Sequence, residues 1–225
     1  MIGPTANLKN ASLNGINLTN ADLAHVRSGG ISGTPSGLPP NWLLIGGNLI
    51  GPTANLANIS LAGLNLASAT LTNVASGGIT GTPSALPTDW QLINGYLVGP
   101  TANLNDANLQ NTYIINGTLA GATLGNADLS NATLHDVELA GVDLTTANLT
   151  GLSARGITGA PTLPPNWQRI NSYLIGPSAN LGGADLSSAN LAGMNLSSAS
   201  FAGRICHPPT SAVPIWRAPH LPLPI

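Results

Sequence analysis

Charged side chains are scarce in this chain of 225 residues: Lys, Arg, Asp and Glu together make up 6% of it, against about 25% in an ordinary soluble domain. The formal net charge is -2, from six basic and eight acidic residues. Electrostatic nucleic-acid binding needs clustered cations, so this composition excludes that class of protein. It also excludes a polybasic patch that would hold the chain on a membrane surface.

Cysteine, aromatic residues and long apolar runs are also lacking. The single cysteine, Cys206, excludes an internal disulfide framework and a cysteine-rich zinc site. No apolar run reaches the roughly 18 residues of a membrane-spanning helix, and the first residues lack the basic and apolar regions of a signal peptide. Aromatic residues make up 4%, too few for a conventional globular core, although the apolar 43% provides material for a core. The length of 225 residues suffices for one domain or two small ones.

What the chain has is a period of five. A large apolar residue, nearly always leucine, recurs at every fifth position in four blocks, and a small or apolar residue, most often alanine, stands two positions before it. These positions are Leu8, Leu13, Leu18, Leu23; Leu56, Leu61, Leu66, Leu71; Leu104, Leu109, Ile114, Leu119, Leu124, Leu129, Leu134, Leu139, Leu144, Leu149; and Leu181, Leu186, Leu191, Leu196, Phe201.

A period of five fits neither regular secondary structure. On a helix each leucine would be rotated by about 140° from the last, so no apolar stripe would form. On a strand, an odd period would place successive leucines on opposite faces. All of them can face one core only if the backbone turns once in each group of five residues, or pentad. The sequence therefore predicts an all-β coil whose turns stack about 4.8 Å apart through backbone hydrogen bonds.

The pentads Ala6-Asn7-Leu8-Lys9-Asn10, Ala127-Asp128-Leu129-Ser130-Asn131 and Ala184-Asp185-Leu186-Ser187-Ser188 resemble the A(D/N)LXX repeat of the pentapeptide-repeat family. This resemblance implies a right-handed quadrilateral β-helix with four pentads in each coil. It covers 23 pentads, which would make roughly six coils.

A second, longer repeat interrupts the pentads three times. Each copy runs from a Gly-Ile-(Ser/Thr)-Gly segment through a Pro, a Leu-Pro and a tryptophan to a final Gly-Pro. We place these inserts at about residues 27–53, 75–101 and 154–178, with their tryptophans at Trp42, Trp90 and Trp167. The third copy is one residue shorter than the others, between Pro161 and Leu163.

The inserts are predicted to leave the five-residue register, because the spacing from Leu23 to Leu56 is not a multiple of five. Apolar runs flank Gly46-Gly47, Asn94-Gly95 and Asn171-Ser172, a pattern typical of a β-hairpin with a type I′ turn. Two paths remain open: a hairpin whose Trp, Leu and Tyr side chains pack on the outside of the coil, or an irregular wider coil.

The organisation expected is one solenoid over residues 1–203 and a non-repeat tail over 204–225. Both ends resemble cuts through a longer array. The tail contains six prolines and is predicted to be disordered, with Trp216 exposed or packed on the last coil.

No catalytic or metal-binding set can be assembled from the sequence, so the expected protein is not an enzyme and needs no cofactor. The histidines His25, His135, His207 and His220 are scattered. The densest polar cluster, His135-Asp136 with Glu138, is interpreted as solvated surface, and Cys206-His207 as part of the tail. The glycine-rich Ser28-Gly29-Gly30 has no phosphate-loop lysine after it and is interpreted as a turn.

Two further sets have structural interpretations. The tryptophans Trp42, Trp90 and Trp167 are the candidate interaction residues, although packing anchors are the favoured interpretation unless they are exposed. Asparagines before the core leucine could stack as ladders. They are Asn7, Asn17, Asn55, Asn65, Asn103, Asn108, Asn190 and Asn195.

The function expected is a non-catalytic structural or interaction module, because solenoids bind partners along extended surfaces. The alternatives are a gyrase-binding mimic of DNA, as in the quinolone-resistance branch of the family, and a surface- or ice-binding solenoid. Low charge disfavours the first, and Asp128 interrupts the threonines Thr118, Thr123 and Thr133 that the second would need.

The expected partner is a protein, and no nucleic acid or membrane span is expected. End-to-end association of the solenoid is a further expectation, since exposed ends carry unpaired backbone groups. Localisation is left open between the cytoplasm, the default without an export signal, and a fragment of a secreted or surface array.

Overall fold

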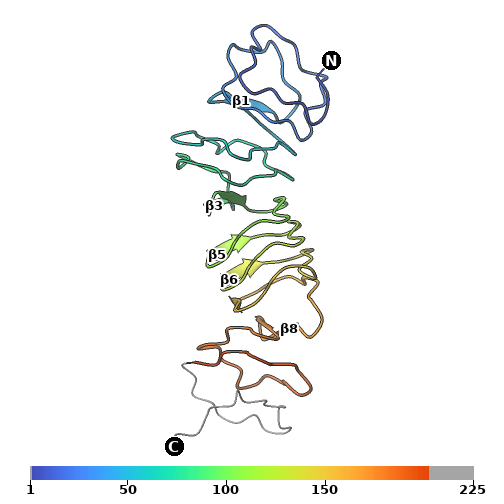
Figure 1. Ribbon diagram of the computed structural model, residues 1–225, viewed down its shortest axis with the longest axis vertical. Coiled ribbons are helices and arrows are strands. Elements are labelled where there is room, and N and C mark those ends of the chain that lie inside the picture. The colour runs from blue at the N-terminus through green and yellow to red at the C-terminus, as the bar shows by residue number, and fades with distance from the viewer. Residues whose placement is uncertain (1, 203–225) are drawn as a thin grey trace, which may run out of the picture.

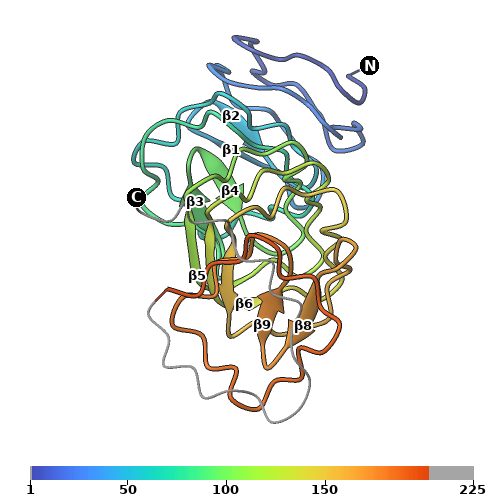
Figure 2. The same ribbon diagram turned by 60° about the horizontal axis from the view of Figure 1, so that its bottom comes forward.

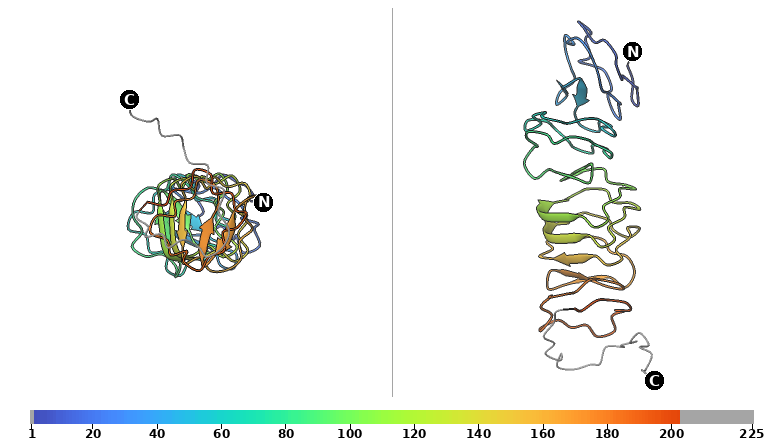
Figure 3. Two further views of the ribbon diagram at one scale, coloured as in Figure 1. Left: turned by 90° about the horizontal axis from the view of Figure 1, so that it is seen from below. Right: turned by 60° about the vertical axis from the view of Figure 1, so that its left-hand side comes forward.

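The computed structural model describes residues 2–202, which form a long rod wound from one chain (Figure 1). The first and last described segments lie at opposite ends of the rod, and the chain advances between them in sequence order (Figures 1 and 3). No helix occurs in residues 2–202. The predicted tail, with Cys206, His207, Trp216 and His220, lies outside the described residues.

Residues 2–202 contain nine short strands, and those labelled in Figure 1 follow one another along the rod in chain order. The nine strands are β1 (Leu43–Ile45), β2 (Asn48–Ile50), β3 (Gln91–Ile93), β4 (Tyr96–Val98), β5 (Tyr113–Thr118), β6 (Thr133–Glu138), β7 (Ser153–Arg155), β8 (Gln168–Ile170) and β9 (Tyr173–Ile175). The strands β5, β6 and β7 form a parallel sheet in that order, and the other six form three antiparallel pairs. Figure 2 labels both strands of each antiparallel pair.

Successive turns of the chain pair in parallel at an offset of four pentads. The Leu8 N–H donates to the Arg27 carbonyl at 2.7 Å, and the Arg27 N–H donates to the Ala6 carbonyl at 2.9 Å. The same offset joins Asn7 to Arg27, Ser12 to Ser32, Asn55 to Ala75, Ser60 to Thr80, Asn103 to Thr123 and Asn108 to Asp128. The chain is therefore a parallel β-solenoid, and its coils superpose around one interior when viewed along the rod (Figure 3).

A tight turn after each core residue produces this winding. The N–H of Ala11 donates to the carbonyl of Leu8 at 3.1 Å, and the N–H of Ile16 donates to the carbonyl of Leu13 at 3.0 Å. The second residue after the leucine usually has a positive φ, such as 58° at Asn10 and 72° at Gly15. A type II turn requires such a conformation at its third position, and Asn and Gly adopt it at least cost. The abundance of Asn and Gly therefore reflects one corner per pentad.

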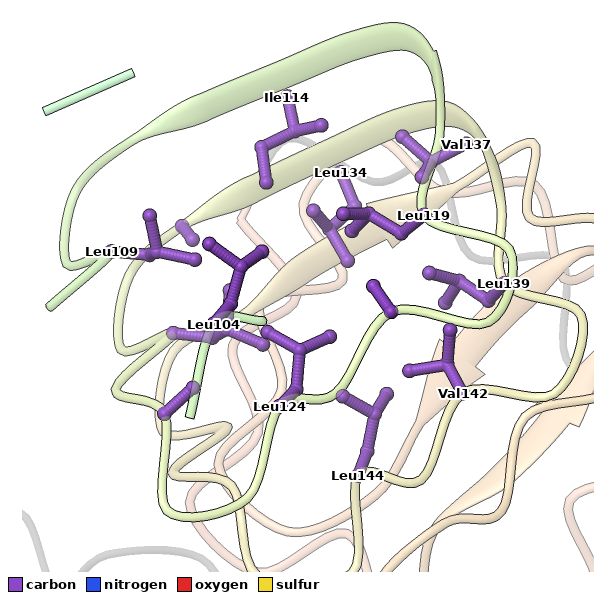
Figure 4. Packing of buried hydrophobic residues seen from close by; sticks show 14 of the residues in the cluster. Leu104, Leu109, Ile114, Leu119, Leu124, Leu134, Val137, Leu139, Val142 and Leu144 are labelled. Atoms are coloured by element: carbon purple, nitrogen blue, oxygen red, sulfur yellow. The ribbon is translucent and has the colours of Figure 1, made fainter. Parts of the chain in front are cut away.

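The large apolar residues point into the interior from successive sides of the coil, as the labelled side chains from Leu104 to Leu124 show (Figure 4). Each of the five labelled residues in that range is at most 1% exposed. Burying a leucine side chain contributes about 1.5–3 kcal/mol to stability. The structure also buries Leu13, Leu18, Leu23, Leu56, Leu61, Leu66, Leu71, Leu129, Leu149 and Leu186.

The ends of the rod are less well covered. Leu8, Leu191 and Phe201 point toward the core but are only half-buried. An interior coil has a neighbour above and below, whereas a terminal coil among residues 2–202 has one on a single side. These three core positions are therefore less buried than those of the interior coils.

The inserts depart from the coil register over a shorter stretch than the sequence predicts. Ser12 pairs with Ser32 and Asn17 pairs with Gly37, so the first part of the insert still stacks on the preceding coil. Leu38 accordingly lies opposite Leu18, four pentads earlier. The five-residue period is disguised in the sequence because Ser28 and Gly33 occupy the two intervening leucine positions.

The extra residues of each insert widen one coil. Arg27 pairs with Asn55 and Ala75 pairs with Asn103, an offset of 28 in both cases. In the third insert the missing residue lies within the stacked part, because Asp143 pairs with Thr162 at an offset of 19. Within the widened coil, β1 pairs with β2, β3 with β4 and β8 with β9 as hairpins.

Each hairpin has an inner strand and an outer strand. The second strand supplies core residues, since Leu49, Leu97 and Leu174 are fully buried. The first strand is only partly buried in the first two hairpins. The structure thus combines features of both paths left open by the sequence, because the coil widens and the hairpin adds an outer layer to it.

Candidate functional site

The polar residue before each core leucine forms a local turn. The side-chain Oδ1 of Asn7 accepts the backbone N–H of Lys9 at 3.2 Å, and Oδ1 of Asn55 accepts the N–H of Ala57 at 3.1 Å. Equivalent bonds occur at Asn17, Asp22, Asn65, Asn103, Asn108, Asp143, Asn148, Asn180, Asp185, Asn190 and Asn195. These asparagines therefore mainly form Asx turns. Side-chain hydrogen bonds between neighbouring coils, such as that from Thr123 to Asn103, are less frequent than these turns.

Asp128 joins neighbouring coils. Its carboxylate accepts the side-chain amide of Gln110 from the coil before and that of Asn148 from the coil after, besides the backbone N–H of Ser130. The bond from Gln110, followed by that from Ser130, lowers the pKa of Asp128 below its ordinary value. Asp143 also has a lowered pKa, mainly because it accepts the Thr145 N–H at 2.8 Å.

The three predicted tryptophans pack against glycines at the end of the insert. A Cβ placed on Gly51, Gly99 or Gly176 would come within 2.4, 2.5 and 2.4 Å of the ring atom Cδ2 of the tryptophan in the same insert. Trp42 is 9% exposed, and the rings of Trp90 and Trp167 are half-buried. This contact explains why a glycine occupies that position in every insert.

The hairpins are fastened to the coils beside them. The Leu49 N–H donates to the hydroxyl of Ser28, and the Leu97 N–H donates to the hydroxyl of Ser76, both at 2.9 Å. The phenol oxygen of Tyr96 accepts the Asn108 N–H from the following coil at 3.2 Å. The glycine-rich segment around Ser28 therefore has a structural role at the base of the hairpin.

The cluster predicted around His135 lies on the outside of the three-stranded sheet. His135 Nε2 lies 3.2 Å from an Asp136 carboxylate oxygen, and its Nδ1 lies 3.1 Å from Nη2 of Arg155 on the next strand. Within residues 2–202, no three His, Cys, Asp or Glu side chains converge to hold a metal ion. His25, the other histidine in this range, is exposed at a turn.

An open depression of about 390 Å³ adjoins this cluster. It is lined by Asp89, Asn116, Gly117, Thr118, Asp136, Glu138, Gly156 and Thr158. Asp89 comes from the turn before Trp90, where the other inserts have Asn41 and Asn166. The lining thus contains three carboxylates and no cationic side chain.

Two exposed apolar residues beside this depression escaped the sequence analysis. Tyr113 is 69% exposed and Ile115 is 40% exposed, and both lie on β5 with the core residue Ile114 between them. The alternation Tyr113-Ile114-Ile115 around an inward position is the sequence signal that could have identified them. Of the large apolar residues described, only Ile16, at 45%, is comparably exposed.

The winding, the corner that recurs with the pentads and the leucine-lined core define a solenoid of five-residue repeats. Comparison with protein-family models agrees: the model of pentapeptide repeats matches eight copies, over residues 6–27, 118–151 and 178–203. The resemblance in the sequence is confirmed, and these segments are repeats of the pentapeptide-repeat family.

Comparisons with individual proteins add little. No curated protein matches the chain. Among solved structures it is similar to HetL, a pentapeptide repeat protein involved in heterocyst differentiation regulation from the cyanobacterium Nostoc sp. strain PCC 7120. The sequences are 23% identical, and the match covers 89% of this chain and 86% of HetL. The TM-score is 0.23, so neither the fold nor the role of this chain is inferred from HetL. In residues 2–202 no helix is long and apolar enough to span a membrane.

Proposed function

We propose that this protein is a non-catalytic scaffold, a right-handed quadrilateral β-helix whose sides are presented to a protein partner. The proposal rests mainly on one observation, that polar side chains along the coils are engaged in hydrogen bonds to the backbone of their own turns. Most of those before the core leucines are bonded to their own backbone two residues later. Such residues stabilise a repetitive outer surface.

The four-sided shape is supported by the register. Parallel partners such as Asn103 and Thr123 are separated by four pentads, so each coil contains four of them, and each pentad ends in a corner. Four corners in one coil give four sides, each with a row of outward side chains that continues from coil to coil. A stiff rod with such rows provides an extended binding surface of the kind that solenoid proteins use.

The experiment that tests the proposal has two stages. The full chain is used as bait in cell extract, and each captured protein is purified and its affinity for the chain measured directly. The outward residues of one side at a time are then replaced by serine, with circular dichroism as the check of folding. We expect one side to be needed for binding while the other three tolerate replacement.

Two results would contradict the scaffold. One is the absence of any purified protein that binds the folded chain directly. The other is turnover of a small-molecule substrate by the purified chain that survives serine replacement of all four sides.

A further inference from the structure

The outer face of β5 combines two properties found together at this one place in residues 2–202. Its first half exposes Tyr113 and Ile115, and its second half, from Asn116 to Thr118, lines the acidic depression. Tyrosine is a favoured anchor in protein interfaces, and adjacent exposed apolar side chains are typical of interaction sites. The apolar pair and the depression are therefore parts of one continuous surface.

The register of the sheet fixes the order of these features. Ile115 lies opposite His135, and His135 lies opposite Arg155, which forms one outward row. Thr118 lies opposite Glu138, which pairs with Thr158, and this forms the next outward row beyond the corner. Along β5 the surface thus changes from apolar to acidic within the six residues from Tyr113 to Thr118, across the corner at Asn116.

The Lys and Arg side chains of residues 2–202 do not pair with the carboxylates of the depression. Within these residues Asp136 lies 3.2 Å from the His135 ring, and no Lys or Arg nitrogen lies within 4 Å of a carboxylate oxygen of Asp89, Asp136 or Glu138. The sequence has no Lys or Arg between Arg27 and Arg155, whereas six acidic residues lie in that interval. Arg155 itself is directed to the His135 ring in the neighbouring row.

We propose that this face of β5, from Tyr113 to the carboxylates of Asp136, Glu138 and Asp89, is the docking site for an extended segment of a protein partner. The segment has apolar side chains at one end, which cover Tyr113 and Ile115, and Lys or Arg at the other, which enter the depression. Charge complementarity selects this occupant over an acidic or purely polar one. The inference rests on the proposed scaffold function and assigns its binding surface.

A short synthetic peptide tests the assignment. In an extended chain, alternate side chains share a face, so the fluorescein-labelled probe Leu-Ser-Leu-Ser-Arg-Ser-Arg presents two leucines and two arginines to the surface. One control replaces both arginines by glutamate, and another replaces both leucines by serine. Fluorescence anisotropy with the full chain should show that the probe binds at least tenfold more tightly than either control peptide.

Matched variants locate the binding. We expect the double variant Tyr113→Ser with Ile115→Ser, and separately Asp136→Asn with Glu138→Gln, each to raise the Kd of the probe about tenfold. The control Ile16→Ser removes an exposed apolar side chain elsewhere. The control Asp22→Asn with Asp185→Asn removes two carboxylates elsewhere, and both controls should stay within twofold of wild type. Higher salt should weaken binding to wild type and leave the acid-neutralised variant less affected.

Equal loss of affinity in the site variants and the controls would overturn the docking site, as would tighter binding of the glutamate peptide. Neither result would touch the scaffold function, because that is judged by direct binding of a purified natural partner. If no purified natural protein binds the chain, but the probe peptide binds at the β5 face alone, the scaffold function would be overturned and the peptide-docking site would be retained.

Discussion

At the scale of single residues, each insert packs its tryptophan ring against the glycine near its end. We expect Gly99→Ala to destabilise the protein by about 1–3 kcal/mol, the usual cost of overpacking, since its Cβ would lie 2.5 Å from Cδ2 of Trp90. Urea denaturation measures the loss. Gly3→Ala is the control, because a Cβ there would have nothing within 4 Å.

A double-mutant cycle shows whether the ring is the cause. In a Trp90→Ala background, the substitution Gly99→Ala should cost less than half of its cost in the wild type, because the ring that it displaces is gone. Equal costs in the two backgrounds would mean that the tryptophan and the glycine do not restrict each other.

The carboxylates of Asp128 and Asp143 give the stability a pH dependence. Both pKa values are lowered in the folded protein by hydrogen bonds to the ionised form. Their contribution is therefore complete above the unfolded pKa, near 3.8, and is lost as the pH falls through the folded values. We expect the urea concentration at which half of the protein is unfolded to decrease when the pH is lowered from 6 to 3.

The variant Asp128→Asn with Asp143→Asn provides the comparison, because an amide oxygen accepts the same bonds without titrating. This variant should lose less stability than wild type over the same pH range. A loss as large as that of wild type would assign the acid sensitivity to other groups.

At the scale of the element, the corner of the pentad depends on a positive φ. Asn73 has a φ of 54°, and Thr72 beside it does not have a positive φ. We expect Asn73→Val to cost about 1–2 kcal/mol, because a β-branched residue is strained in the left-handed conformation that Asn tolerates. Thr72→Val should change stability by less than about 0.5 kcal/mol. Asn73→Gly should be close to neutral, and thermal denaturation distinguishes the three.

The hairpin is a second element whose attachment can be measured. Tyr96→Phe removes the phenol oxygen that accepts the Asn108 N–H, and Tyr173→Phe does the same for the Asp185 N–H in the third insert. Each should cost about 1 kcal/mol in chemical denaturation, the usual value of one hydrogen bond. No loss in either variant would show that water replaces the phenol at both places.

The period of five was sufficient to predict which residues face inward, because only a coil can gather leucines at that spacing. It could not predict how far each insert continues the coil, because Ser28 and Gly33 stand where leucines would mark the register. The exposed pair Tyr113 and Ile115 has a sequence signal of a different kind. Ile114 fixes which positions point outward, and the apolar residue type at two of these outward positions marks the pair.

At the scale of the whole molecule, three clusters of buried residues follow one another along the described rod, and its coils are held by a repeated offset. Trp90 and Trp167 each pack against two of these clusters. The central claim is that residues separated by four pentads lie side by side on neighbouring coils. With Cys206 replaced by serine, the pair Thr123→Cys and Asp143→Cys tests it, since Thr123 and Asp143 are parallel partners. In the control pair, Thr123→Cys and Asn148→Cys, the separation is one pentad longer.

The measurement is the rate of disulfide formation under mild oxidation. We predict that the pair separated by four pentads closes readily, because partners on adjacent strands lie within disulfide reach, while the pair separated by five pentads stays reduced. Equal rates for both pairs, or closure of the longer pair alone, would contradict a coil of four pentads.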